Sequence, residues 1–572
     1  MKQHKLMGAL ALTGAFALAL SGCATDTGNT GNGGGDNGGD KAPETQAADY
    51  NPQPRENLKQ GGTVNFPIAE IPEQLNAFNT DASASTATLA AWYTPQVMLM
   101  KPDGTPYKND NYLDEWKYEV KDGKTVLTFT FTDKATWNDG TPMDWTAIDA
   151  TWKANRSNDE GFHPNAIDGY KEIEKVEQGD TPKTAIVTFK GEFAWPQMPF
   201  LTGVIHPKLA DPDTFNNAMI DDPHAEWGAG PYTVDEFDAN TDFISFKPND
   251  KWWGDKPLLD RVTFQGMDSQ ASINAFKNGQ IDQVGVGTKD RLAQVADMKD
   301  ITIHRAQQTA NTLLEVDAEK PQFQDVEVRK AFFMAINIEQ QKKIAWNGLD
   351  YDEEPAGSFT LFSFQPGYSN SLEKAGWKYD PDEANKILDE AGWEKGADGI
   401  REKDGVKLSV TYPIFSDDPT QAALAQSMQK SEKEIGFDLK IDVRPSNKFA
   451  EDYNSKNWDV AGLRFTSSDP FGAAWFFQLY GQDQGLNLSG VQNAETDQKI
   501  HDQVESISDP VKQTAAAMDL EVEIFKEWGL IPLYNGPSIS ATKKGLANLT
   551  PEPYVGLDLF GVQPVENVGW EK

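Results

Sequence analysis

At 572 residues the chain is too long for one small core, and its length predicts two or three domains. Its 88 acidic against 52 basic residues give a formal net charge of −36 at pH 7, a field that disfavours nucleic acid and anionic lipid head groups as partners. Its single cysteine, Cys23, excludes a disulfide within the chain and a metal site built from several cysteines.

The N-terminal residues are typical of an export signal. Lys2 and Lys5 make a basic start, and the apolar run of residues 6–20 is too short for a confident membrane span. The string Leu20-Ser21-Gly22-Cys23 follows directly and resembles the bacterial lipobox, in which the cysteine becomes the acylated N-terminus. We therefore predict a signal peptide over residues 1–22 and lipidation at Cys23. The alternative is an ordinary secretory signal followed by a chance cysteine.

A polar segment comes next. Residues 24–58 hold a Gly/Asn/Asp/Thr run and then a proline-containing polar stretch, so they offer few apolar side chains to bury and are expected to stay disordered. A flexible chain of this length averages about 30 Å from end to end. We predict that residues 23–59 form the lipidated cysteine and a tether that holds a globular body near a membrane. No later stretch is apolar enough to span one.

Short strands and amphipathic helices alternate in the remaining chain. Apolar and polar residues alternate over residues 127–132 and 185–189, which predicts strands, and residues 243–246 are a further strand candidate. One apolar helix face is formed by Val328, Ala331, Phe332, Ala335 and Ile336. A further helix is expected between a cap at Asp380 and a stop at Gly392, and residues 496–528 read as helical with a break near Pro510. This mixture predicts the α/β class, with sheets covered by helices in more than one lobe.

Sequence motifs of catalysis are missing. The chain has no G-x-S-x-G elbow, no H-E-x-x-H, no P-loop and no glycine-rich dinucleotide fingerprint. Its six histidines have no metal-ligand spacing, and His206 and His224, each beside a proline, are interpreted as turn residues. We therefore predict a binding protein without catalytic residues, cofactor or metal. The alternatives are a secreted glycan-active hydrolase that uses an acidic pair, and an adhesin or signalling receptor.

Several segments resemble, in order, the conserved blocks of one protein family. They are Trp137-Asn138-Asp139-Gly140-Thr141-Pro142, Gly228-Ala229-Gly230-Pro231-Tyr232, Asn249-Asp250-Lys251-Trp252-Trp253-Gly254, residues 275–282, residues 323–331, Tyr379-Asp380-Pro381 and Ile531-Pro532-Leu533-Tyr534. Together they resemble the extracellular solute-binding proteins of family 5, which include the oligopeptide-, dipeptide- and nickel-binding components of ABC importers. The resemblance extends from about Gly62 to the C-terminus.

The resemblance implies a two-lobed periplasmic-binding-protein-like fold with a hinge and an extra domain inserted in the first lobe. The expected boundaries are residues 60–103, 216–316 and 534–572 for lobe I, 104–215 for the inserted domain, and 317–533 for lobe II. Ligand is expected in the cleft between the lobes, and its binding is expected to close the hinge.

The resemblance also implies contact residues in three stretches, residues 92–97, 458–470 and 534–535. The predicted ligand contacts are Tyr93, Thr94, Gln96, Arg464, Phe465, Thr466, Ser467, Asp469, Trp475, Tyr534 and Asn535. Alternatively, Arg464 pairs with Asp469, Asp469 caps a helix, and Trp92 and Trp475 belong to the core. The aspartate with which peptide binders of this family hold the ligand's amino group is replaced here by Thr466 or Ser467. Sugars and other solutes are therefore alternative ligands.

The expected function is therefore that of a substrate-binding lipoprotein of an ABC importer. We expect it to be a monomer on the extracytoplasmic face of a bacterial cell membrane, attached only by its lipid. Its expected partners are a small solute, most favourably a peptide, and the importer's permease and ATPase subunits. An oligosaccharide or another non-peptide solute is the alternative ligand.

Overall fold

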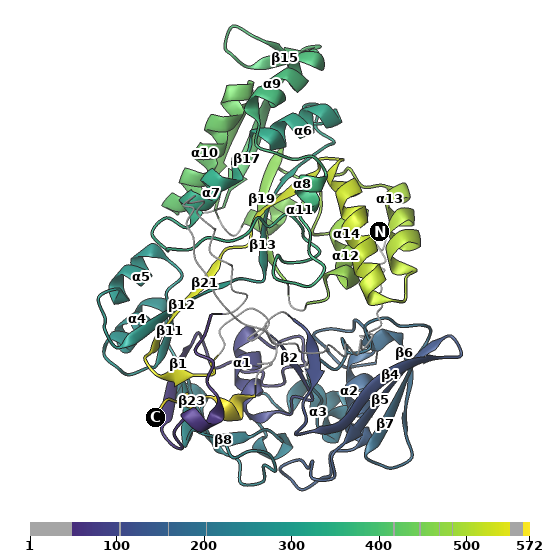
Figure 1. Ribbon diagram of the computed structural model, residues 1–572, viewed down its shortest axis with the longest axis vertical. Helices are drawn as coiled ribbons and strands as arrows, with labels where there is room; N and C mark the ends of the chain where they lie inside the picture. Colours follow the sequence, from purple (N-terminus) through teal and green to yellow (C-terminus); the bar gives the residue numbers. More distant parts are fainter. Residues whose placement is uncertain are drawn as a thin grey trace, which may run out of the picture.

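The computed structural model describes residues 49–101, 104–157, 160–201, 203–415, 418–445, 448–467, 470–482, 484–549 and 564–572. Helices and strands are labelled as in Figure 1. The predicted signal peptide, Cys23 and the tether up to residue 48 lie outside the described residues, and so do Ser468 and Asp469. Within the described ranges no helix is long and apolar enough to cross a bilayer.

The described chain forms two lobes, one above the other in Figure 1. We call residues 310–534 the upper lobe and the other described residues the lower lobe. The main sheet of the lower lobe has the order β1-β10-β9-β8, with β1 parallel to β10. Its strands are β1 (Thr63–Ile68), β10 (Arg261–Gly266), β9 (Phe243–Pro248) and β8 (Tyr232–Asp238), and α1 (Ala84–Tyr93) packs against it.

A separate antiparallel sheet lies beside the main sheet, at the lower right of Figure 1, with the order β4-β5-β7-β6. Its members are β4 (Leu113–Lys121), β5 (Lys124–Phe131), β7 (Thr184–Phe189) and β6 (Ile173–Gln178), and α2 (Trp145–Asn155) packs against β6 and β7. Leu127, Phe129 and Phe131 are buried while the threonines between them are not, so the alternation predicted for these strands is confirmed.

A small sheet lies where the lobes meet, with the order β11-β21-β12. It consists of β11 (Gln283–Gly285), β21 (Pro537–Lys543) and β12 (Ile301–Gln307). The helices α4 (Ser269–Lys277) and α5 (Lys289–Val295) lie close by at the left of Figure 1. This sheet is tied to the lower lobe, because Asp282 accepts a 2.8 Å hydrogen bond from the backbone N–H of Asn65 on β1.

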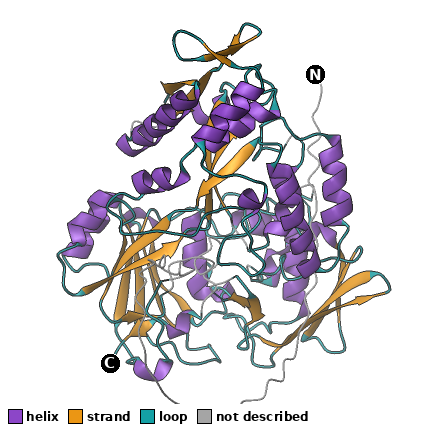
Figure 2. Cartoon of the chain, turned by 45° about the horizontal axis from the view of Figure 1, so that its top comes forward, coloured by secondary structure: helices purple, strands orange, loops and turns teal. Residues whose placement is uncertain are grey.

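The upper lobe packs helices around a central group of strands (Figure 2). One sheet has the order β19-β13-β20, and a parallel pair, β17 with β18, lies beside it. The strands are β13 (Ala310–Val316), β17 (Ser409–Ile414), β18 (Asp438–Val443), β19 (Val460–Thr466) and β20 (Leu530–Tyr534). The main helices are α6 (Val326–Ala335), α7 (Ile338–Ala345), α9 (Pro381–Glu390), α10 (Pro419–Ile435), α13 (Ala494–Ile500) and α14 (Pro510–Phe525).

The helix predictions for this lobe are confirmed. The apolar face predicted around Phe332 is buried in α6. Asp380 caps α9 by accepting the N–H of Glu383 at 2.9 Å, and Gly392 follows the helix with a φ of +82°. The long C-terminal segment divides into α13 and α14, and Pro510 opens the second helix.

Two short segments connect the lobes. The outgoing crossing, Gln308 and Thr309, joins β12 to β13, and the returning crossing, Asn535 and Gly536, joins β20 to β21. They run side by side, because the N–H of Gln308 donates to the carbonyl of Gly536 at 2.8 Å. Sheet pairing puts the whole of β13 in the upper lobe. The residue boundaries expected for the lobes and the inserted domain remain a prediction.

Candidate functional site

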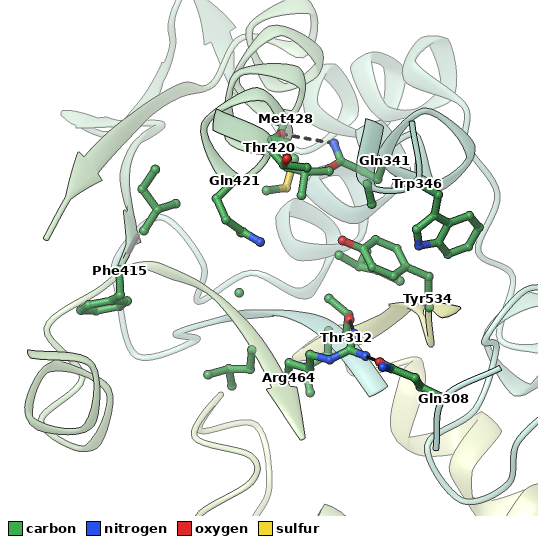
Figure 3. Close-up of a pocket in the computed structure, with 18 of the residues that line it drawn as sticks. Gln308, Thr312, Gln341, Trp346, Phe415, Thr420, Gln421, Met428, Arg464 and Tyr534 are labelled. Carbon is green, nitrogen blue, oxygen red and sulfur yellow. Dashed lines mark hydrogen bonds between the residues drawn. The ribbon is translucent and has the colours of Figure 1, made fainter. Parts of the chain in front are cut away.

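The upper lobe contains a cavity of about 500 Å³ beside the two crossings. We call it the upper cavity. Its walls come mainly from β13, α7, the end of β17, α10, β19, β20 and the two crossings, and Gly287 and Pro537 of the lower lobe also line it. The side chains that Figure 3 labels around it are Gln308, Thr312, Gln341, Trp346, Phe415, Thr420, Gln421, Met428, Arg464 and Tyr534. This volume is in the range of small-molecule sites in proteins.

One end of the upper cavity is polar. Arg464 on β19 pairs in register with Thr312 on β13, and its guanidinium donates to the Thr312 hydroxyl at 2.8 Å and to the Gln308 side-chain oxygen. Tyr534 lies opposite, with its ring edge-on to Trp346 at 5.5 Å between centroids. Burial raises the pKa of Tyr534 to about 12, so its hydroxyl stays neutral and can donate or accept a hydrogen bond.

The other end of the cavity is apolar. Phe415 follows β17 and meets Phe449 edge-on at 5.4 Å, and Met428 and Leu424 of α10 also line the cavity. Figure 3 shows Phe415 across the cavity from Tyr534 and Trp346. Thr420 and Gln421 lie between the two ends. The site therefore offers one end for hydrogen bonds and one for an apolar group.

Charge is sparse in this lining. Among the described residues that line the upper cavity, Arg464 carries the single charged side chain. Amide and hydroxyl groups supply the other polar contacts, from Gln308, Gln341, Gln421 and Thr420. In the described part of the chain, no group of three or more His, Cys, Asp or Glu side chains is arranged to hold a metal ion.

Of the predicted upper-lobe contacts, the structure brings Arg464 and Tyr534 to the cavity. Phe465 points elsewhere and packs 6.0 Å from Phe359. Thr466 is exposed at the end of β19, and the N–H of Ser467 donates to the carbonyl of Thr309 in the outgoing crossing at 2.7 Å.

Two more predicted contacts, Trp475 and Asn535, are not among the residues that line the cavity. Trp475 is half-buried in the turn before the short helix Phe476–Tyr480. Asn535 is buried in the returning crossing, where its amide donates to the carbonyl of Ala310 at 2.8 Å. Asp469 lies outside the described residues, as does its predicted pairing with Arg464.

The predicted lower-lobe contacts are not at the upper cavity. Tyr93 is buried, stacks 5.9 Å from Phe246, and its carbonyl accepts the N–H of Gly230 at 2.9 Å. Thr94 and Gln96 follow α1, and their side chains donate to carbonyls of that helix, at Ala90 and Ala91. Tyr93 and Thr94 instead line a small cavity of about 40 Å³. Contact of Tyr93, Thr94 and Gln96 with the ligand remains a prediction.

Two other sequence interpretations of lower-lobe residues are confirmed. Trp92 belongs to the core, with its ring edge-on to Tyr232 at 5.4 Å. His206 and His224 both precede short helical turns. His206 is buried as well, and burial lowers its pKa, so the neutral form is favoured.

Sequence reasoning missed most of the cavity. The residues it did not single out come from α7, from the end of β17 and from the start of α10, and they include Gln341, Trp346, Phe415 and Gln421. A signal was present, because β17, α10 and β18 form a parallel strand–helix–strand unit, and ligands tend to bind at the carboxyl ends of such strands. Asp418 marks the start of α10 by accepting the N–H of Thr420 at 2.7 Å.

Comparisons with known proteins address the family directly. The family model described as bacterial extracellular solute-binding proteins, family 5 (middle), matches residues 111–487. The oligopeptide-binding protein OppA of Mycobacterium tuberculosis H37Rv is 28% identical over 521 residues, which cover 90% of this chain and 87% of that protein. The nickel-binding periplasmic protein of Escherichia coli K12 is 28% identical over 369 residues, 61% of this chain and 67% of that protein.

Solved structures agree on the fold. A periplasmic EDTA-binding protein, EppA, superposes with a TM-score of 0.77 over 93% of this chain and all of that chain, at 22% identity. The oligopeptide-binding protein AppA from Bacillus subtilis, solved with a nonapeptide, gives a TM-score of 0.63 at 19% identity over 90% of this chain and all of that chain. The predicted two-lobed fold is confirmed.

The expectation of a binding protein instead of an enzyme is also confirmed, since the matched family and relatives are solute-binding proteins. The proteins of this family act outside the cytoplasm, which agrees with the location predicted from the sequence. The model match covers well over half of the chain. The chain therefore belongs to the bacterial extracellular solute-binding proteins of family 5, the substrate-binding components of ABC importers.

Proposed function

We propose that this protein captures a peptide in the upper cavity, closes its lobes around it and delivers it to the permease of an ABC importer. The observation that carries the proposal is the cavity itself, which lies beside both crossings and has one polar and one apolar end. A solute bound there touches the segments about which the lobes can turn. A ligand that binds the closed form better shifts the population toward it.

The chemistry of the lining favours a short peptide. Side-chain amides of Gln308, Gln341 and Gln421 can pair with peptide N–H and C=O groups. The guanidinium of Arg464 can hold a carboxylate or a carbonyl. The contact between Phe415 and Phe449 provides a surface for an apolar side chain. The relative in Mycobacterium tuberculosis is named as an oligopeptide-binding protein, which supports the same ligand class.

A non-peptide solute is the second candidate. It is favoured by Thr466 and Ser467, which stand at the end of β19 where the resemblance leads us to expect an amine-binding aspartate. A neutral hydroxyl gives a hydrogen bond worth about 0.5–1.5 kcal/mol, against about 1.5–3 kcal/mol for a bond with a charged partner. A free amino group therefore gains little from these two residues.

Calorimetry separates the candidates. The full chain would be titrated with an equimolar pool of tri- to pentapeptides, with the same pool acetylated at the N-terminus, and with a pool of oligosaccharides of similar mass. We expect the peptides to bind, and acetylation to weaken binding by less than about tenfold. Binding of the oligosaccharides alone would contradict the peptide proposal. A loss near one hundredfold on acetylation would mean that another acid holds the amine.

We further propose that Cys23 anchors the protein in the membrane through acyl chains. Its support is the string Leu20-Ser21-Gly22-Cys23. Acyl chains contribute about 0.8 kcal/mol per buried CH₂, so two long chains hold stably. Cys23→Ala is expected to release the protein into the medium, measured by fractionating cells. A variant that stays with membranes after a high-salt wash would show that the anchor lies elsewhere.

A further inference from the structure

The returning crossing is held by a buried side chain that is not part of the crossing itself. Glu353 lies in the segment after α7 and is only 5% exposed. One of its carboxylate oxygens, Oε1, accepts the backbone N–H of Asn535 at 2.6 Å, and the other, Oε2, accepts the backbone N–H of Gly536 at 2.9 Å. Two adjacent backbone donors thus converge on one carboxylate.

The upper lobe fixes this carboxylate from its own side. The hydroxyl of Tyr351 donates to Oε2 at 2.9 Å, and the ammonium of Lys342 on α7 donates to the carbonyl of Glu353 at 2.8 Å. Burial raises the pKa of Glu353, while these donors oppose that rise. A carboxylate only accepts hydrogen bonds, and the three groups bonded to Oε1 and Oε2 all donate, so the ionised form matches the geometry.

The hydrogen bonds around Glu353 connect further to the outgoing crossing and to the cavity. The side chain of Asn535 receives a hydrogen bond from the Gln307 amide at 2.8 Å, and the N–H of Gln308 donates to the carbonyl of Gly536. Gln308, Tyr534 and Gly536 line the upper cavity. Gly536 has a φ of +94°, and a Cβ placed there would come within 3.8 Å of Trp346 and of the Arg464 guanidinium. The Glu353 carboxylate therefore fixes the backbone that forms part of the cavity wall.

We propose that Glu353 is a positioning residue of the binding site: its carboxylate locks the returning crossing to the upper lobe, and so keeps the hinge-side wall of the cavity in the form that receives ligand. Its contact with the ligand is not required. The inference deepens the proposed function and rests on it only for the effect on peptide binding. The effect on the crossings is independent of any ligand.

Glu353→Gln tests the proposal. The carboxamide has one acceptor oxygen and an NH₂ group, so one of the two backbone N–H groups loses its acceptor and faces a donor. In hydrogen exchange of the full chain without ligand, we expect the amides of residues 535 and 536 to exchange at least about tenfold faster. The amide of Gln308, which bonds to the Gly536 carbonyl and not to Glu353, is expected to exchange faster as well. The amides of β17 should keep their wild-type rates.

Glu354→Gln is the matched control, because it removes the same charge from an exposed neighbour. Glu354→Gln should leave the amide exchange rates of both crossings unchanged. Equal acceleration in β17 and the crossings of Glu353→Gln would indicate general destabilisation and overturn the proposal, and so would unchanged crossings. If Glu353→Gln does not fold, Tyr351→Phe carries the test. It removes only the hydroxyl donor and should accelerate exchange at the crossings alone, by a smaller factor, and wild-type rates there would overturn the proposal.

Titration with the tri- to pentapeptide pool gives the functional arm. Glu353→Gln is expected to bind the pool at least about tenfold more weakly than wild type, while Glu354→Gln binds as wild type does. Equal affinity in all three proteins would overturn the positioning role. If the pool binds none of them, the peptide proposal fails, and the exchange rates still decide the role of Glu353.

Discussion

The two lobes bury different kinds of side chain. In the described part of the chain, all but one of the buried acidic side chains lie in the upper lobe, and these are Glu315, Asp317, Glu353, Glu432, Asp452 and Glu521. The exception is Glu566 in the lower lobe. Aromatic contacts do not distinguish the lobes, since Trp92 meets Tyr232 and Phe264 in the lower lobe and Trp346 meets Tyr534 in the upper lobe.

The difference follows from how each lobe holds its loops. Glu353 binds the returning crossing, and Glu521 on α14 accepts the N–H groups of Phe359 and Thr360 and the hydroxyl of Tyr480 through one oxygen. Irregular backbone next to a cavity has N–H groups without sheet or helix partners, and a buried carboxylate satisfies several at once. The lobe that shapes the site is therefore also the lobe in which buried carboxyl groups, those of Glu353 and Glu521, hold irregular backbone.

Removing a buried carboxyl group whose pKa is raised far above its ordinary value should have the largest effect. Burial raises the pKa of Glu315 on β13 to about 8, although the Tyr453 hydroxyl, 3.1 Å away, opposes the rise. Between its ordinary value of 4.5 and about 8, the folded protein binds a proton that the unfolded chain has released, so stability falls as pH rises through this window and then levels off. Glu315→Gln should flatten that profile and stabilise the protein at pH 8 by up to about 4 kcal/mol.

Urea unfolding across this pH range measures the effect. The control is Glu319→Gln, an exposed acid on the same stretch, which should keep the wild-type slope. If Glu315→Gln keeps that slope as well, buried charge does not dominate the pH response of the upper lobe, and the contrast between the lobes would need another cause.

A pair of substitutions sharpens the contrast at the site. Arg464→Ala removes the charged side chain of the upper cavity and should weaken peptide binding more than about tenfold, or 1.4 kcal/mol, with little change in unfolding. Gln96→Ala removes a buried amide that donates to Ala91 at 3.3 Å, so it should lower the free energy of unfolding by about 1 kcal/mol and leave affinity nearly unchanged.

Calorimetry and urea unfolding on both variants decide between the two roles. If Gln96→Ala weakens binding as strongly as Arg464→Ala, the lower lobe contributes a ligand contact that the positions of Tyr93, Thr94 and Gln96 do not reveal.

The fold was largely predictable because its signals are local. Alternation in β5 and the Asp380 cap of α9 depend on neighbours in sequence, and the family resemblance supplied the order of the segments. Tyr93 was predicted as a ligand contact, but the sequence did not indicate the direction in which its side chain points. A Cβ on Gly230 would lie 2.8 Å from the Tyr93 carbonyl carbon, so this part of α1 is packed against a glycine-rich turn of its own lobe.

The cavity was less predictable because its walls meet only in three dimensions. Gln341 and Gln421 are far apart in sequence and belong to different helices, and both polar side chains are equally suited to a solvated surface. Glu353 gave no signal either. It stands in the acidic run of residues 350–354, which reads as an exposed loop, and its burial follows from contacts with Asn535 and Gly536 near the other end of the chain.

The smallest predicted effect concerns a direct contact between the lobes, on the side of α14 and away from β12 and β21 (Figure 1). Trp195 of the lower lobe donates its indole N–H to the Gln513 side-chain oxygen at 3.2 Å and lies 4.8 Å from the Phe471 ring. Trp195→Phe keeps most of the ring packing and removes the donor. The closed form should lose about 0.5–1.5 kcal/mol of stability, which raises the apparent Kd of the peptide by at most about tenfold.

Trp152→Phe is the control, since Trp152 is equally buried within the lower lobe and its indole N–H has no hydrogen-bond partner. Calorimetry with small-angle scattering of the ligand-free chain measures both parts: Trp195→Phe should bind more weakly and show a larger radius of gyration. Unchanged affinity and radius would mean that this contact only packs the lobes, and that closure is set at the crossings where Glu353 lies.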